Sequence, residues 1–131
     1  MLRAALGILV GVLAGMIVAA LGEAAGHAIF PPPRGVGFSN PAQASAAIAR
    51  LHPGAFASVL VAWGCAAFAG GLTGAFIARR GAWPAYAVAA TIFALAAWTM
   101  TMIAGHPWWM WIGAVAFIGG GGYLAGRFSK A

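Results

Sequence analysis

Four side chains in this sequence could carry chemistry, one carboxylate and three imidazoles: Glu23, His27, His52 and His106. Glu23 is the only acidic residue of the chain. His27 follows it by four positions, so the two side chains share one face of a helix. With the other two histidines they would form a donor set that suits zinc or another divalent metal. His52 and His106 each precede a proline, however, where ordinary turn residues are also expected.

A lone carboxylate inside an apolar segment has three fates: it is paired, it holds a proton, or it binds a cation. We expect the paired state, in which the outer connection folds back so that Arg50 or His52 reaches Glu23 and His27. A proton or ligand site that uses Glu23 is the alternative. A metal site formed with the histidines is the second alternative.

The sequence carries none of the enzyme signatures that would use such groups. It has no aspartate, hence no carboxylate pair, and neither HExxH nor GxSxG occurs. The glycine run 119–122 lacks the Lys-Ser or Lys-Thr of a phosphate loop and indicates helix packing or a flexible break. The aromatic cluster 108–111 is typical of a membrane belt. We expect a non-enzymatic protein without catalytic residues, and no cofactor other than the divalent metal of the second alternative.

The segments that must position these groups are strongly apolar. The 131 residues are 63% hydrophobic and 6% charged, whereas charged residues make up about a quarter of a soluble protein. The net charge of +6 is spread over the ends of apolar segments and forms no recognition motif. The lipid bilayer is therefore the expected partner, and nucleic acid is excluded. The single cysteine, Cys65, is expected to be a small buried hydrophobe.

Four segments are long enough to cross a bilayer, which takes about 20 residues: about 2–30, 54–78, 83–104 and 108–126. The outer connection 31–53 contains a helix too short to span, with Ser39-Asn40-Pro41 as its start and His52-Pro53 as its end. The predicted fold is all-α, a polytopic membrane protein of one domain (1–131). It is a bundle of four transmembrane helices with a short surface helix between the first two.

Small residues predict which spans pack together. Gly7, Gly11 and Gly15 recur at every fourth position of the first span and form one smooth ridge. The second span has a matching small row that includes Gly70 and Gly74. Small residues let helix backbones approach closely in membranes, so we expect these rows to meet as a glycine zipper.

The basic residues predict the orientation. Five of them flank one side of the spans, and only Arg34 and Arg50 flank the other; the five are Arg3, Arg79, Arg80, Arg127 and Lys130. Because basic loops stay in the cytoplasm, both termini are expected there, in a bacterial inner membrane. Glu23 and the histidines then belong to the outer half.

One resemblance rests on Glu23-Ala24-Ala25-Gly26 in the first helix of a four-span chain. In this the sequence resembles the small multidrug resistance transporters, with Glu23 and Gly26 matching their motif. The resemblance implies a dimeric transporter in which Glu23 exchanges protons for cationic drugs. The long outer connection and the outward position of Glu23 depart from that family.

A second resemblance covers most of the chain. It rests on Glu23 and His27 before a proline end, on Pro53-Gly54-Ala55-Phe56, on Gly70-Gly71 and on His106-Pro107-Trp108. These features are similar to a family of uncharacterised small four-span bacterial inner-membrane proteins, which implies the fold and no activity.

The sequence as a whole favours a non-enzymatic integral membrane protein. We expect a homo-oligomer or a subunit of a larger membrane complex, with a Glu/His polar cluster facing outward. The alternatives are a small proton- or cation-coupled transporter that uses Glu23, and a membrane metal-binding protein or metalloenzyme.

Overall fold

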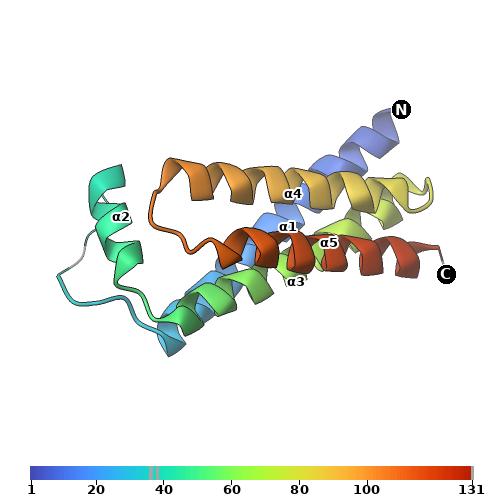
Figure 1. Cartoon of the computed structure of the whole chain (residues 1–131). Helices are drawn as coiled ribbons and strands as arrows, with labels where there is room; N and C mark the ends of the chain where they lie inside the picture. The colour runs from blue at the N-terminus through green and yellow to red at the C-terminus, as the bar shows by residue number, and fades with distance from the viewer. Residues whose placement is uncertain (36, 38, 131) are drawn as a thin grey trace.

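The chain folds into five α-helices, shown in Figure 1 for a computed structural model that describes residues 1–35, 37 and 39–130. The helices are α1 (Leu2–Ile29), α2 (Pro41–Ala49), α3 (Pro53–Ala78), α4 (Trp83–Met102) and α5 (Trp109–Ser129), and the described residues contain no strand. All except α2 are long and apolar enough to cross a membrane. The predicted fold class, an all-α polytopic membrane protein with four spanning helices and a short helix after the first, is confirmed.

The helix ends follow the local signals in the sequence. The Asn40 side chain accepts a hydrogen bond from the Gln43 backbone N–H (2.9 Å) and caps α2, with Pro41 in its first turn. α4 ends at Met102, two residues before the expected end, and α5 runs from Trp109 to Ser129 instead of 108–126. Positions 36 and 38 of the connection 31–53 lie outside the described residues.

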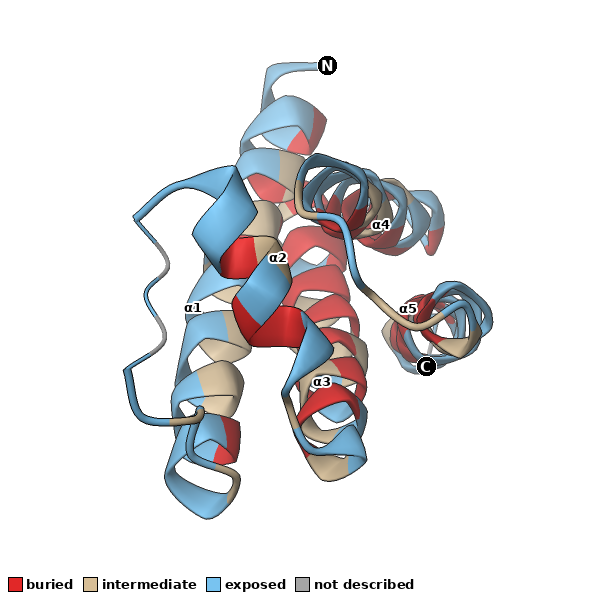
Figure 2. Cartoon of the chain, turned by 60° about the vertical axis from the view of Figure 1, so that its left-hand side comes forward, coloured by how far each residue is buried: buried red, intermediate tan, exposed pale blue. Residues whose placement is uncertain are grey.

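α3 is the central helix of the bundle. Figure 2 shows the buried residues concentrated on α3, with α1, α4 and α5 arranged around it. Its large side chains Phe56, Leu60 and Trp63 pack into one core with side chains of α4 and α5, among them Val88, Ile92, Met110 and Ile118. The outward faces of α1, α4 and α5 carry exposed apolar side chains, as expected where lipid is the surrounding medium.

The N-terminal half of α1 packs on α3 with almost no space between the backbones. A Cβ atom on Gly7 would lie 2.7 Å from the carbonyl oxygen of Gly74, and one on Gly11 would lie 2.6 Å from that of Gly70. One on Gly15 would lie 2.9 Å from the carbonyl oxygen of Ala66. Each step of four residues along α1 thus meets a step of four back along α3, so the two small rows run antiparallel and in register.

Further along α1 the contact with α3 moves to a different row. Gly22 and Gly26 now face Ala62 and Ser58 of α3. The reason is geometric, because a row of every fourth residue turns by roughly 40° per step around a helix of 3.6 residues per turn. The row that starts at Gly7 therefore leaves the close backbone contact with α3 before it reaches Glu23.

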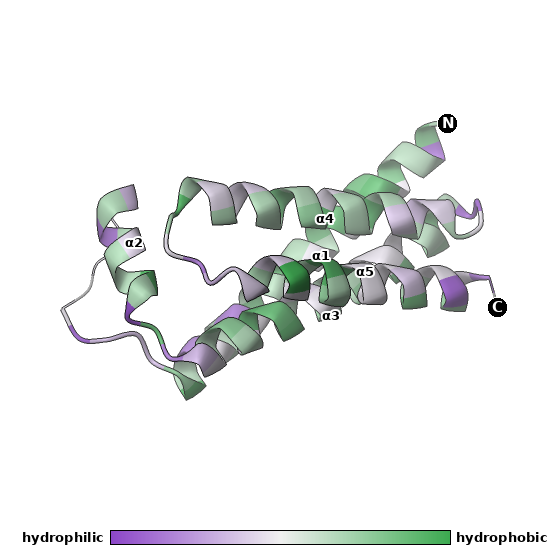
Figure 3. Cartoon of the chain, in the orientation of Figure 1, coloured by the Kyte–Doolittle hydropathy of each residue, from purple (hydrophilic) through white to green (hydrophobic). Residues whose placement is uncertain are grey.

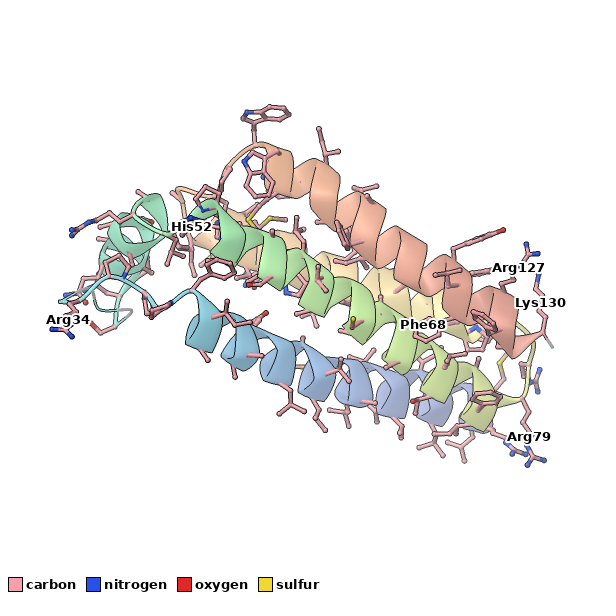
Figure 4. The ribbon with its side chains drawn as sticks, turned by 90° about the horizontal axis from the view of Figure 1, so that it is seen from below. Arg34, His52, Phe68, Arg79, Arg127 and Lys130 are labelled. Atoms are coloured by element: carbon pink, nitrogen blue, oxygen red, sulfur yellow. The ribbon has the colours of Figure 1, made fainter. Side chains whose placement is uncertain are left out.

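Charged residues gather at the two ends of the bundle. Both termini lie at one end (Figure 1), where Figure 4 also places Arg79, Arg127 and Lys130. We call this the basic end, and the opposite end, where Arg34 and His52 lie, the α2 end. Figure 3 shows the most strongly hydrophilic residues near these two ends, and mostly hydrophobic or neutral residues along the helices between them.

Candidate functional site

A lateral groove between α1 and α4 contains the only carboxylate side chain. The two helices cross near the middle of the bundle and diverge toward the α2 end (Figure 1), and α3 contacts both of them. The cavity measures about 260 Å³. We call it the Glu23 groove; it is lined by Gly15, Met16, Ala19, Ala20 and Glu23 of α1, Trp63 of α3, and Ile92, Leu95, Ala96 and Thr99 of α4.

Glu23 is held in this groove by a tryptophan. The Trp63 indole Nε1–H donates a hydrogen bond to Glu23 Oε1 at 2.9 Å. The Trp63 ring is buried in the core, and a buried indole N–H needs an acceptor. An ionised carboxylate can accept about four hydrogen bonds, and Glu23 is half-buried at the groove wall. Glu23 lines the groove, so its remaining acceptor positions are available to a hydrogen-bond donor there.

The three histidines lie apart from this site. His27 is exposed, because the row of every fourth residue has turned further outward one step after Glu23. The His52 ring stacks on Phe30, with 5.2 Å between ring centres, and its Nδ1 accepts a hydrogen bond from the Gly54 N–H (2.9 Å). His106 Nδ1 lies 2.8 Å from the Ile103 carbonyl oxygen, which it contacts as a donor.

The two proline-linked histidines thus lie at helix boundaries, as the simpler interpretation of the sequence held: His52 caps the start of α3, and His106 follows the end of α4. The short helix α2 itself ends at Ala49, before His52-Pro53, which was expected to end it. No group of three or more His, Cys, Asp or Glu side chains within residues 1–35, 37 and 39–130 is placed to hold a metal ion. Glu23, His27, His52 and His106 are not brought together as one donor set.

The expected contact of Arg50 or His52 with Glu23 is not formed between these described residues. Arg50 is exposed on the outer connection, where it lines a shallow depression with Gly35, Gly37 and Gln43. The reason is the path of α2, which packs Ile48 into the core and lies against the α4–α5 turn at Gly105. The connection is therefore drawn away from Glu23, and Trp63 takes the role that we expected of a basic residue.

Trp63 is the site residue that the sequence analysis missed. Tryptophans in membrane proteins favour the interfaces, yet Trp63 stands ten positions inside α3. An indole N–H in the middle of a spanning helix needs a hydrogen-bond acceptor, and a lone carboxylate needs a donor. These two needs could have suggested the pair from the sequence. Cys65 is also corrected: it is exposed on the bundle surface and lines a groove between α3 and α5.

Comparison with known protein families, with curated proteins and with solved structures finds no match. The chemistry of the Glu23 groove must therefore be argued from its own groups. It offers one carboxylate, the Thr99 hydroxyl and otherwise apolar walls. Such a site accepts a positive charge or a hydrogen-bond donor that is attached to an apolar body.

Proposed function

We propose that this protein is a small, non-enzymatic inner-membrane protein that binds an apolar cation in the Glu23 groove and exchanges it for a proton. The observation that carries the proposal is the environment of Glu23. Its hydrogen-bond partner is the neutral Trp63 indole, and its position opens on the gap between α1 and α4. The orientation that fits the charge distribution puts both termini and the basic end in the cytoplasm and the Glu23 groove in the outer half.

The location of Glu23 supports binding over a purely structural role. Glu23 stands six residues before the end of α1, about 9 Å below the α2 end of that helix. A charged side chain at this depth is costly unless it is paired or reaches water. The indole hydrogen bond brings no positive charge to the carboxylate, so the groove has room for a proton or a cationic ligand to supply one. Competition between these two for one carboxylate is the minimal basis of coupled exchange.

The shape of the groove limits the ligand. A volume of about 260 Å³ lies just below the usual range of about 300–1,000 Å³ for small-molecule sites. The groove therefore holds the charged atom of the ligand and one of the apolar groups attached to it. The other apolar groups of the ligand extend between α1 and α4 into lipid. Met16 and Leu95, both about half exposed, form the edges of this opening.

The test compares a cation with a neutral molecule of similar shape. Purified protein in detergent is titrated with methyltriphenylphosphonium and, separately, with triphenylphosphine oxide. In the variant Glu23→Gln the amide oxygen still accepts from Trp63, so the fold is kept and only the charge is lost. We expect this change to weaken phosphonium binding at least about tenfold, which corresponds to about 1.4 kcal/mol.

The neutral oxide is expected to bind equally to wild type and to Glu23→Gln, and His27→Gln is expected to bind the phosphonium like wild type. In proteoliposomes, a pH gradient is expected to drive phosphonium uptake by wild type and not by Glu23→Gln. Equal phosphonium affinity in wild type and Glu23→Gln would refute the proposal.

The second candidate is a subunit role, in which a helix of a second copy fills the groove. It is favoured by α1, which is the least buried of the four spanning helices, and by the small residues Gly15, Ala19 and Ala20 on the groove wall. If this is the function, Ala20→Cys in a Cys65→Ala background forms disulfide-linked dimers in the membrane. Phosphonium binding is then absent, and Glu23→Gln weakens the oligomer.

A further inference from the structure

A second groove is lined by a different face of α4 from the one that lines the Glu23 groove, and it suits a different ligand. We propose that an anionic phospholipid binds between α4 and α5, with one acyl chain in the groove and its phosphate beside Arg127 at the basic end. This inference does not depend on the function of Glu23.

The acyl-chain part of the site is an apolar cavity of about 420 Å³ between α4 and α5. Its walls include Ala89, Phe93, Val115 and Gly119. A Cβ atom on Gly119 would meet nothing within 4 Å, so bare backbone forms one side of the cavity. From Phe93 to Tyr86 the cavity extends over seven residues of α4, about 10 Å, which is most of one leaflet of a hydrocarbon core about 30 Å thick.

The headgroup part of the site lies at the mouth of the cavity nearest the basic end. Tyr86 of α4 and Tyr123 of α5 line this mouth. The Arg127 Nη1 lies 3.5 Å from the Tyr123 hydroxyl oxygen, so the guanidinium is held beside the cavity. The Tyr86 ring packs against Gly126, where an added Cβ would lie 2.7 Å from the Tyr86 hydroxyl oxygen. A guanidinium and two phenol hydroxyls therefore surround the point where an acyl chain would leave the groove.

The charge distribution selects an anionic headgroup. The basic end carries five basic residues, while the only acidic residue of the chain, Glu23, lies toward the α2 end. Near a membrane surface each basic side chain attracts anionic lipid by about 1 kcal/mol. Arg127 also presents paired N–H donors that match the geometry of a phosphate. A zwitterionic lipid also brings a positive group close to these basic side chains, so its headgroup is attracted less strongly.

The experiment titrates the full chain in detergent with dioleoylphosphatidylglycerol or dioleoylphosphatidylcholine and measures the dissociation constant of the first bound lipid by native mass spectrometry. Wild type is expected to bind phosphatidylglycerol roughly fivefold more tightly than phosphatidylcholine, the ratio that about one favourable basic contact gives. Arg127→Gln removes this preference. Arg79→Gln at the same end of the bundle is the charge control and keeps it.

A matched pair on α5 tests the acyl-chain part. Gly119 and Gly120 are neighbours, and a Cβ atom on either meets nothing within 4 Å, but Gly119 lines this cavity and Gly120 lines the groove beside Cys65. Gly119→Leu fills the cavity and is expected to weaken both lipids, whereas Gly120→Leu leaves both dissociation constants unchanged.

Four results would overturn the proposal. One is equal affinity of wild type for the two lipids; another is an equal loss of preference in Arg127→Gln and Arg79→Gln, which indicates diffuse charge. The third is equal behaviour of the two leucine variants. Competition by water-soluble glycerol phosphate at the same concentration as the lipid would show a phosphate site without an acyl seat, which also contradicts it. Because Arg127 is exposed, its variant keeps the fold and decides the question even if Gly119→Leu does not fold.

Discussion

A single methyl group at Gly70 should separate the two helices that anchor the bundle. In Gly70→Ala the new Cβ would lie 2.5 Å from the carbonyl oxygen of Gly11 and 3.1 Å from the Cα of Gly15. These neighbours are backbone atoms, so no rotamer change can relieve the contact. The helices must move apart by roughly 1 Å, which loosens the neighbouring contacts along the row.

The size of the effect follows from two opposing contributions. Overpacking costs about 1–3 kcal/mol, while alanine in place of a helical glycine gains about 1 kcal/mol in propensity. We expect Gly70→Ala to lower the free energy of unfolding by about 1 kcal/mol. Gly120→Ala is the matched control, because its Cβ meets nothing within 4 Å and only the propensity gain of about 1 kcal/mol remains. The free energy of unfolding should thus fall in Gly70→Ala and rise in Gly120→Ala, and the two variants should differ by about 2 kcal/mol.

The assay is reversible unfolding in mixed micelles with increasing sodium dodecyl sulfate, followed by circular dichroism. Both variants should retain the wild-type helical signal before the transition, and their midpoints should move to opposite sides of the wild-type midpoint. If Gly70→Ala is as stable as Gly120→Ala, the α1–α3 backbones do not approach as closely as described, and the reasoning from the small rows fails.

Two further predictions concern the α2 end and the orientation. His52→Ala removes the side-chain acceptor at the start of α3 and should lower the free energy of unfolding by about 1 kcal/mol. His52→Asn can still accept a hydrogen bond from the Gly54 N–H, so its free energy of unfolding should fall less. Equal losses in the same micelle assay would show that the stacking of His52 on Phe30, and not the cap, stabilises this end. In a background without Cys65, the variants Ser39→Cys and Arg80→Cys should react with a membrane-impermeant maleimide from opposite sides of the membrane. Ser39→Cys should react from the periplasm. Labelling of both variants from one side would contradict the proposed orientation.

Local signals in the sequence were sufficient to predict most of the helix ends. Pro41 after Asn40 starts α2 as expected, because a proline in the first turn loses no hydrogen bond. His52-Pro53 was expected to end the short helix, but α2 ends at Ala49 and Pro53 is the first residue of α3, one position before the expected start of that span. Residue size was sufficient to suggest a mate for the first span, since a row of glycines admits a backbone and little else. Both inferences rest on chemistry within a few residues of sequence.

The candidate site depended on angles that accumulate along a helix. Glu23 lies on the same every-fourth row as Gly7 and Gly15, and the slow rotation of that row turns it away from the close backbone contact with α3 and into the groove beside α4. Its partner Trp63 is 40 residues away, so the pair could be found only from the crossing of α1 and α3. The path of the outer connection likewise depends on the packing of Ile48 into the core, which involves residues far from it in the sequence.

The bond between Glu23 and Trp63 also has a consequence for biosynthesis. Because the indole lies 40 residues downstream of the carboxylate, α1 emerges from the ribosome before α3 does, and it enters the bilayer without that donor. α1 is the most apolar of the four spans and α5 the least, which suits a sequential order of insertion. The first helix can carry its own acidic residue into lipid, whereas the last is received by a surface that the earlier helices have already assembled. Integration and assembly are then separate stages for this chain, and the newly inserted α1 waits with its carboxylate and its glycines uncovered until α3 arrives.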